Sequence, residues 1–191
     1  MKQIYNPETK TLLYDQNIVM NSCNIDYLTD PKIYFPPDVE NLIYSSKCRS
    51  WILDNLPNTI TNITFLNYDE IIENLPNTVI TLTIKCNVLI KNLPSNLKYL
   101  SICDCFYDKE IKCFPESLEE LKFGYYFNGP IGNLPHALKH LSFGHNFNQP
   151  IGILPPTLKY LSFGFNFNQP IGILPSCLEY LSFGNNFNQP I

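Results

Sequence analysis

The sequence predicts a solenoid: short repeats stacked along one axis, with a parallel β-sheet on the concave face and little or no regular helix on the convex side. Three near-identical segments begin at Leu134, Leu154 and Leu174, at a constant offset of 20 residues. A fixed period of roughly 20 to 50 residues is typical of repeat folds whose units bury their apolar face against neighbours. Inside each segment polar and apolar residues alternate as in a strand. Prolines such as Pro150 and Pro155 exclude a regular helix on the return side.

Residues 1–34 do not follow the repeat. The stretch from Lys2 to Tyr14 contains two apolar runs around Asn6-Pro7, a pair that favours a turn, and therefore predicts a β-hairpin. The end of a solenoid needs a capping unit, because the first repeat would otherwise expose its core to water. We expect residues 1–34 to form an N-terminal cap.

Residues 35–191 divide into eight repeats, here called rungs. Each rung opens with Phe or Leu followed by Pro, and apolar residues follow 4, 7 and 9 positions later. The openers are Phe35, Leu56, Leu75, Leu93, Phe114, Leu134, Leu154 and Leu174. This agreement at four positions predicts that the divergent early segments fold like the late ones.

Alternation within a rung assigns the two faces of its strand. Leu141 and Phe143 point inward, and His140 and Ser142 point outward. Glycines at 124, 144, 164 and 184 indicate either a positive φ or a close backbone approach at the corner. Phenylalanines at 127, 147, 167 and 187 predict an aromatic spine, with isoleucines at 131, 151, 171 and 191 beneath it. Asparagines flank that spine, and we expect them to be buried and to satisfy backbone groups at the turn.

Composition excludes several classes of protein. The chain has 191 residues, a net charge of −4 and no run of basic residues, which argues against a nucleic-acid partner. No apolar stretch approaches the roughly 18 residues that would indicate a membrane span. The N-terminus lacks the apolar core of a signal peptide, and seven irregularly spaced cysteines do not form a disulfide framework. We expect an intracellular, cytoplasmic protein with reduced thiols.

The motif F-N-x-P-I carries a resemblance to a known family. It occurs at Phe127–Ile131, Phe147–Ile151, Phe167–Ile171 and Phe187–Ile191, and it resembles the FNIP repeat, which is related to leucine-rich repeats. The resemblance implies a leucine-rich-repeat-like solenoid. Family members often carry an F-box or another effector domain before the repeats, for which the first 34 residues are too short. What the resemblance implies here is a bare repeat array that acts as an interaction module and not as an enzyme.

Two side-chain clusters were considered as chemical sites. His140 and Ser142 share a face, but the serine recurs as Ser162 and Ser182 in rungs without histidine, which favours a small strand-face residue over a nucleophile. Cys86, Cys103, Cys105 and Cys113 form the only metal-like cluster. A shared metal fits the geometry, but the spacing is not that of a structural zinc site, and buried thiols are the favoured interpretation. We expect no catalytic residue, no metal and no cofactor.

Outward aromatic residues are the candidate binding site. They are Tyr99, Tyr125, His140, His145, Tyr160, Phe165 and Tyr180. Aromatic residues with few charges are typical of interface cores, so we expect this concave face to bind a protein partner. The alternative is that tyrosines occur there because they suit exposed strands.

A second hypothesis concerns the C-terminal end. The chain stops at Pro190-Ile191, two residues short of a full rung and without a polar cap. An open end leaves strand groups unpaired, so the alternative function is a structural array that associates with a second copy through this rung.

Overall fold

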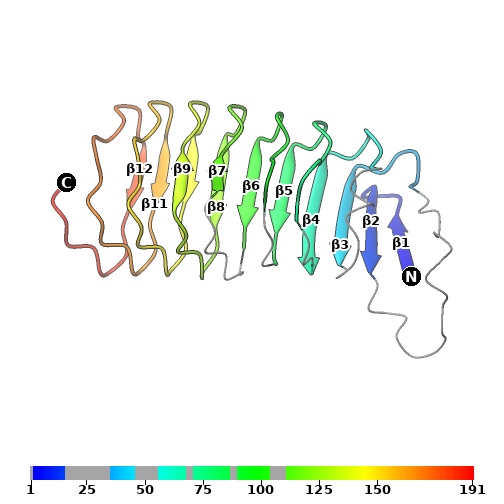
Figure 1. Ribbon diagram of the computed structural model, residues 1–191, viewed down its shortest axis with the longest axis horizontal. Helices are drawn as coiled ribbons and strands as arrows, with labels where there is room; N and C mark the ends of the chain where they lie inside the picture. The colour runs from blue at the N-terminus through cyan, green and yellow to red at the C-terminus, as the bar shows by residue number, and fades with distance from the viewer. Residues whose placement is uncertain (1, 16–34, 46–55, 68–70, 87–89, 104–110) are drawn as a thin grey trace.

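The computed structural model describes residues 2–15, 35–45, 56–67, 71–86, 90–103 and 111–191. In these ranges the strands stand side by side along one axis, with the N-terminal hairpin at one end and Ile191 at the other (Figure 1). The described ranges contain no helix, and so none long and apolar enough to cross a membrane. The predicted fold class, a helix-poor solenoid built on a parallel sheet, is confirmed.

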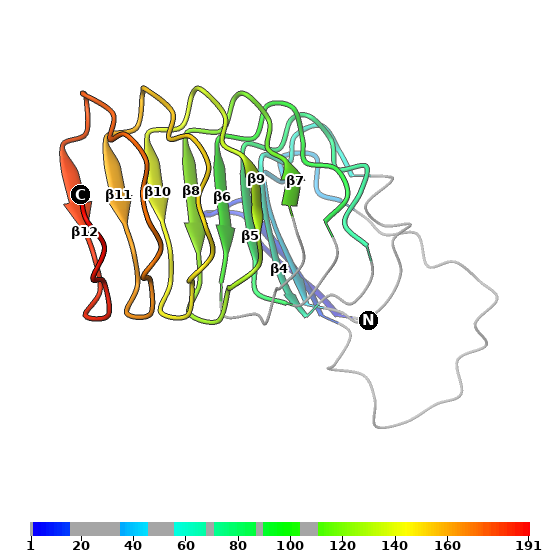
Figure 2. The same cartoon turned by 60° about the vertical axis from the view of Figure 1, so that its left-hand side comes forward.

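One ten-stranded sheet runs the length of the molecule. In spatial order its strands are β1 (Lys2–Asn6), β2 (Thr11–Asp15), β3 (Asn41–Ser45), β4 (Asn62–Asn67), β5 (Thr81–Ile84), β6 (Tyr99–Ile102), β8 (Glu120–Phe123), β10 (His140–Ser142), β11 (Tyr160–Ser162) and β12 (Tyr180–Ser182). Every neighbouring pair is parallel except β1 and β2. A second sheet pairs β7 (Ile111–Cys113) with β9 (Ile131–Asn133) on the return side (Figure 2).

The register places equivalent residues of successive rungs side by side. Leu141 pairs with Leu121 on one side and Leu161 on the other, and all three are fully buried. His140, one position earlier, is exposed. The alternation predicted from the sequence is therefore confirmed.

The N-terminal hairpin joins the sheet directly. Asn6 Oδ1 accepts the backbone N–H of Glu8 at 3.0 Å and so stabilises the turn between β1 and β2. Strand β2 then pairs in parallel with β3, and Leu12 is buried in the common core. The rest of the predicted cap, residues 16–34, lies outside the described residues, and the capping role of residues 1–34 stays a prediction.

Two columns of phenylalanine fill the core of the later rungs. The predicted spine is present: the ring of Phe147 lies 5.8 Å from that of Phe127 and 6.0 Å from that of Phe167. A second column, at the strand ends, stacks at 5.3 to 5.4 Å and consists of Phe123, Phe143, Phe163 and Phe183. The columns touch, with the rings of Phe143 and Phe147 3.9 Å apart. Each ring in the middle of the array therefore contacts three others.

Ile131, Ile151 and Ile171 pack against this core, as expected. Ile191, predicted to join them, is 77% exposed.

The corner glycines are required by a close backbone approach. No glycine among the described residues has a positive φ. A Cβ on Gly144 would lie 2.0 Å from the carbonyl oxygen of Gly124, and one on Gly164 would lie 2.0 Å from that of Gly144. Of the two explanations that the sequence left open, the close approach is therefore the correct one.

Asparagine side chains bridge successive rungs. Asn148 Oδ1 accepts the backbone N–H of Asn168 at 2.9 Å and the side-chain amide of Gln169 at 3.1 Å. Asn166 Nδ2 donates to Asn146 Oδ1 at 3.3 Å in a second row. The predicted role in satisfying backbone groups is confirmed. The expectation that these asparagines are buried is wrong, because they lie at the corner and are half-buried or exposed. Asn87 and Cys105, which the rung alignment places at the position equivalent to Asn146, lie outside the described residues.

A third set of bridges was not predicted. A hydroxyl or thiol three residues after the rung opener donates to backbone carbonyls of the preceding rung. The bonds run from Ser117 to Ser95 and Leu97 (both 2.7 Å), from Thr157 to Leu138 (3.0 Å) and from Cys177 to Leu158 (3.3 Å). The signal is present in the sequence as a recurrent Ser, Thr or Cys before the first buried Leu.

Candidate interaction surface

The outward face of the main sheet carries two columns of side chains. The first outward column is Asn41, Asn62, Thr81, Tyr99, Glu120, His140, Tyr160 and Tyr180. The second is Ile43, Thr64, Thr83, Ser101, Lys122, Ser142, Ser162 and Ser182. Both columns have the membership that the rung alignment predicts.

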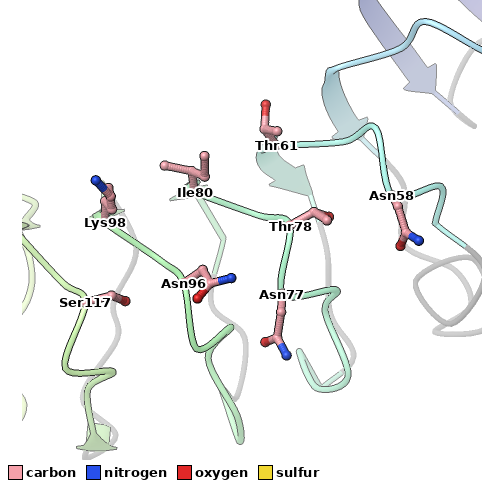
Figure 3. Close-up of a pocket in the computed structure, with 8 residues that line it drawn as sticks. All are labelled: Asn58, Thr61, Asn77, Thr78, Ile80, Asn96, Lys98 and Ser117. Carbon is pink, nitrogen blue, oxygen red and sulfur yellow. The ribbon is translucent and has the colours of Figure 1, made fainter.

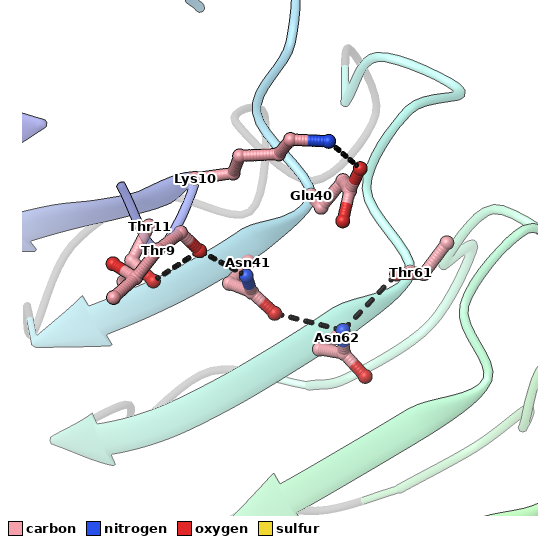
Figure 4. A network of polar contacts seen from close by, with 7 residues as sticks. All are labelled: Thr9, Lys10, Thr11, Glu40, Asn41, Thr61 and Asn62. Carbon is pink, nitrogen blue, oxygen red and sulfur yellow. Dashed lines mark hydrogen bonds and ion pairs between the residues drawn. The ribbon is translucent and has the colours of Figure 1, made fainter. Parts of the chain in front are cut away.

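The first outward column is polar and internally satisfied near the N-terminus. Asn41 Nδ2 donates to the carbonyl of Thr9 at 2.7 Å, and Asn62 Nδ2 donates to Asn41 Oδ1 at 2.7 Å (Figure 4). The Asn62 amide also reaches Thr61 Oγ1 at 3.0 Å. These amides hold rungs together, and part of their hydrogen-bonding capacity is already used within the fold.

The same column becomes aromatic near the C-terminus. The rings of Tyr160 and Tyr180 stack at 4.4 Å and 3°, and His140 lies 6.0 Å from Tyr160 at 27°. We call His140, Tyr160 and Tyr180 the strand stack. Tyr99 is 42% exposed but belongs to a separate position, because Glu120 occupies the intervening rung.

The other predicted site residues form a stack of their own at the corner. His145 lies between Tyr125, at 4.6 Å and 9°, and Phe165, at 5.0 Å and 4°. We call these three residues the corner stack. The seven aromatic positions predicted from the sequence thus separate into two triplets and an isolated Tyr99.

Ion pairs run along the rungs just before the strands. Glu119 lies between Lys98 at 3.1 Å and Lys139 at 2.6 Å, and Lys159 meets Glu179 at 2.7 Å. Hydrogen bonds from Lys139 and then Lys98 hold the pKa of the Glu119 carboxyl below its ordinary value. These groups are largely exposed, so each pair contributes little to stability, although each of these charged side chains has an oppositely charged neighbour.

A shallow groove lies where this row of charged side chains is interrupted. Thr61 and Ile80 stand where other rungs carry Lys or Glu, and beside them the surface is hollowed by about 380 Å³ (Figure 3). The lining residues are Asn58, Thr61, Asn77, Thr78, Ile80, Asn96, Lys98 and Ser117. Several of their polar atoms already bond within the fold, such as Asn77 Oδ1 to the backbone N–H of Ser95 at 2.9 Å. Sequence reasoning missed this groove, although the break in the charged row is visible in the alignment of the rungs.

Of the two clusters that the sequence suggests as chemical sites, the structure describes His140 and Ser142 fully and the cysteines in part. His140 and Ser142 are two positions apart on one face, and the ring of His140 contacts Tyr160. Cys86 and Cys103 are half-buried, and Cys113 is exposed, so the expectation of buried thiols is wrong for these three. They lie at or beyond the strand ends, and Cys86 packs against the core with only part of its surface. Cys105 lies outside the described residues, and within the described ranges no three His, Cys, Asp or Glu side chains are grouped closely enough to hold a metal ion.

The chain is similar in sequence and in fold to known repeat proteins. A family model described as FNIP Repeat matches residues 87–126, 107–144, 129–166, 147–173 and 165–191. No curated protein matches the chain. Among solved structures, the chain is similar to CroV588, described as a novel circular LRR protein, with 28% identity and a TM-score of 0.54. That match covers 82% of this chain but 35% of CroV588, so the chain spans about a third of that protein's length.

Proposed function

The chain belongs to the FNIP repeat family, and from that premise we propose that it is a non-enzymatic module that binds a protein partner on the outward face of its sheet. The repeat family and the leucine-rich-repeat-like fold are typical of protein-interaction modules in general. The sequence predicts this sheet face to be the concave one, which in solenoids is commonly the extended binding surface.

One observation carries the choice of face: the two stacks expose large aromatic side chains without charged residues among them. Tyr180 is 47% exposed, Tyr125 47% and Phe165 40%. Interface cores are enriched in aromatic residues and depleted in charged ones. Rings already held by their stacked neighbours lose little conformational freedom on binding, so more of the contact energy is retained as affinity.

The test compares partner capture by two variants of the full chain. Tyr160→Ala combined with Tyr180→Ala removes most of the strand stack, whereas Ile153→Ser alters a residue of the return side that is 93% exposed. After affinity purification from the native cell and quantitative mass spectrometry, we expect the tyrosine variant to lose its partners and the isoleucine variant to keep them. Unchanged partners in the tyrosine variant, with an unchanged circular dichroism spectrum, would refute this assignment of the face.

A further inference from the structure

Between its stacked members, the strand stack presents ring edges and hydroxyl groups, not ring faces. With the rings of Tyr160 and Tyr180 stacked at 4.4 Å, a partner's side chain has no space to enter between them, since carbon atoms in contact already stand about 3.5 to 4.0 Å apart. A bound segment must therefore lie along the row of edges. Aromatic edges carry the positive part of the ring quadrupole, and tyrosine hydroxyls donate hydrogen bonds. This surface favours a ligand rich in hydrogen-bond acceptors.

Serine hydroxyl groups next to the strand stack add further hydrogen-bond donors to this surface. Ser142, Ser162 and Ser182 lie beside the strand stack in the second outward column. Within the described part of the chain, no group hydrogen-bonds to these hydroxyls or to those of Tyr160 and Tyr180. They are available as donors to a bound segment.

The outward face of β10, β11 and β12 carries no Asp, Glu, Lys or Arg. Its outward positions hold only His, Tyr and Ser, and in the adjoining row Lys159 is paired with Glu179 and Lys139 with Glu119, which Lys98 shares. A charged segment would lose hydration here without gaining a counter-charge. The preferred ligand is therefore neutral.

The spacing of the rungs selects one backbone conformation. Neighbouring strands stand about 4.8 Å apart, so two steps, from His140 to Tyr180, span about 9.6 Å. One turn of a polyproline II helix, three residues at about 3.1 Å, spans about 9.3 Å. An extended strand repeats every 6.6 to 6.8 Å or so and matches neither one step nor two. An α-helix, with a pitch of about 5.4 Å, drifts by about 0.6 Å at every rung.

We propose that the strand stack binds a proline-rich segment in the polyproline II conformation, lying along the solenoid axis across β10, β11 and β12. Proline contributes a carbonyl acceptor and no N–H donor, and a polyproline II helix leaves its carbonyls without internal partners. Such a segment matches a neutral, donor-presenting surface and leaves no donor of its own unpaired. Its stiffness lowers the entropic cost of docking. This inference rests on the proposed function and specifies the chemistry of the partner.

The experiment titrates the full chain into a fluorescein-labelled oligoproline peptide and into a glycine–serine peptide of equal length, with anisotropy as the readout. The oligoproline is expected to bind and the flexible control is not. Tyr160→Phe with Tyr180→Phe keeps the stacked rings and removes two hydroxyls. Since a neutral hydrogen bond contributes on the order of fivefold to affinity, we expect this variant to bind about 25-fold more weakly. The control Ile153→Ser, at a return-side residue that is 93% exposed and outside the candidate binding site, retains full affinity.

The outcomes separate this inference from the proposed function. If the oligoproline binds no better than the glycine–serine peptide, or binds the double Phe variant as well as the parent chain, the polyproline assignment is overturned. If that happens while the double Ala variant still loses its cellular partners, the face stands and its ligand has another conformation. If the double Ala variant keeps all its partners, the face itself is wrong.

Discussion

Gly164→Ala tests the close packing of successive rungs. A Cβ on Gly164 would lie 2.0 Å from the carbonyl oxygen of Gly144, 2.4 Å from its carbonyl carbon and 2.7 Å from the Cα of His145. All three are backbone atoms and cannot turn away as a side chain does. Because real Cβ contacts essentially never fall below 3.0 Å, the two rungs must separate by about 1 Å, which is about a fifth of the strand spacing.

That displacement sets the expected loss of stability. The backbone N–H of Asn166 donates to the carbonyl of His145 at 2.9 Å, and an opening of about 1 Å takes this bond beyond hydrogen-bonding distance. Overpacking costs about 1 to 3 kcal/mol, and a lost hydrogen bond costs about 1 kcal/mol more. We therefore expect the free energy of unfolding to fall by about 2 to 4 kcal/mol. In a chain of this length the melting temperature would fall by about 4 to 16 °C.

The matched control is Gly152→Ala, because no atom lies within 4 Å of the Cβ that it adds. Its φ is not positive, so alanine fits without strain, and we expect stability to stay the same or to rise by up to about 1 kcal/mol. Urea and thermal unfolding followed by far-ultraviolet circular dichroism give the midpoints to compare. If both variants unfold at the same midpoint, the contact between rungs is not the reason for glycine at the corner.

Three further changes test the bonds between rungs. Phe147→Ala removes a ring that contacts three others and should cost about 3 to 5 kcal/mol, measured as a lower urea midpoint; a cost below 1 kcal/mol would contradict the stacked core. Asn148→Ala removes the acceptor for the Asn168 N–H, should cost about 1 to 3 kcal/mol and should speed hydrogen exchange at that amide. The lysine partners of Glu119 lower its folded pKa, so its contribution to stability is present above the ordinary value of 4.5 and is lost as the pH falls through the folded value. Glu119→Gln should therefore flatten the stability profile below about pH 4.5, and an unchanged profile would show that the ion pairs do not act.

The strand positions could be predicted from the sequence because two local rules determine them. Alternation assigns Leu141 inward and His140 outward, and the Leu-Pro opener aligns one rung with the next. Both rules depend on neighbouring residues only, so they survive in the early rungs, where the repeat has diverged. The membership of both outward columns followed from them.

The corner could not be predicted in the same detail, since the two-residue alternation that assigns strand side chains to a face does not apply where the backbone turns. Contact between Phe143 and Phe147, and the choice between a positive φ and a close approach at Gly144, depend on how the chain bends between them. The identity of the binding residues remains a prediction, because exposure and stacking describe a surface and not its occupant.

A single column of the sheet contains two chemically different surfaces on one backbone. Asn41 donates a hydrogen bond to the turn of the N-terminal hairpin and Asn62 donates one to the preceding rung, so a change there loosens the fold before it alters recognition. The hydroxyls of Tyr160 and Tyr180 make no such bond within the described ranges, so their removal leaves the rungs joined. Free hydrogen-bonding capacity is what a partner can use, and this half of the column retains it. The C-terminal half of the column is therefore where binding and stability can be separated by mutation.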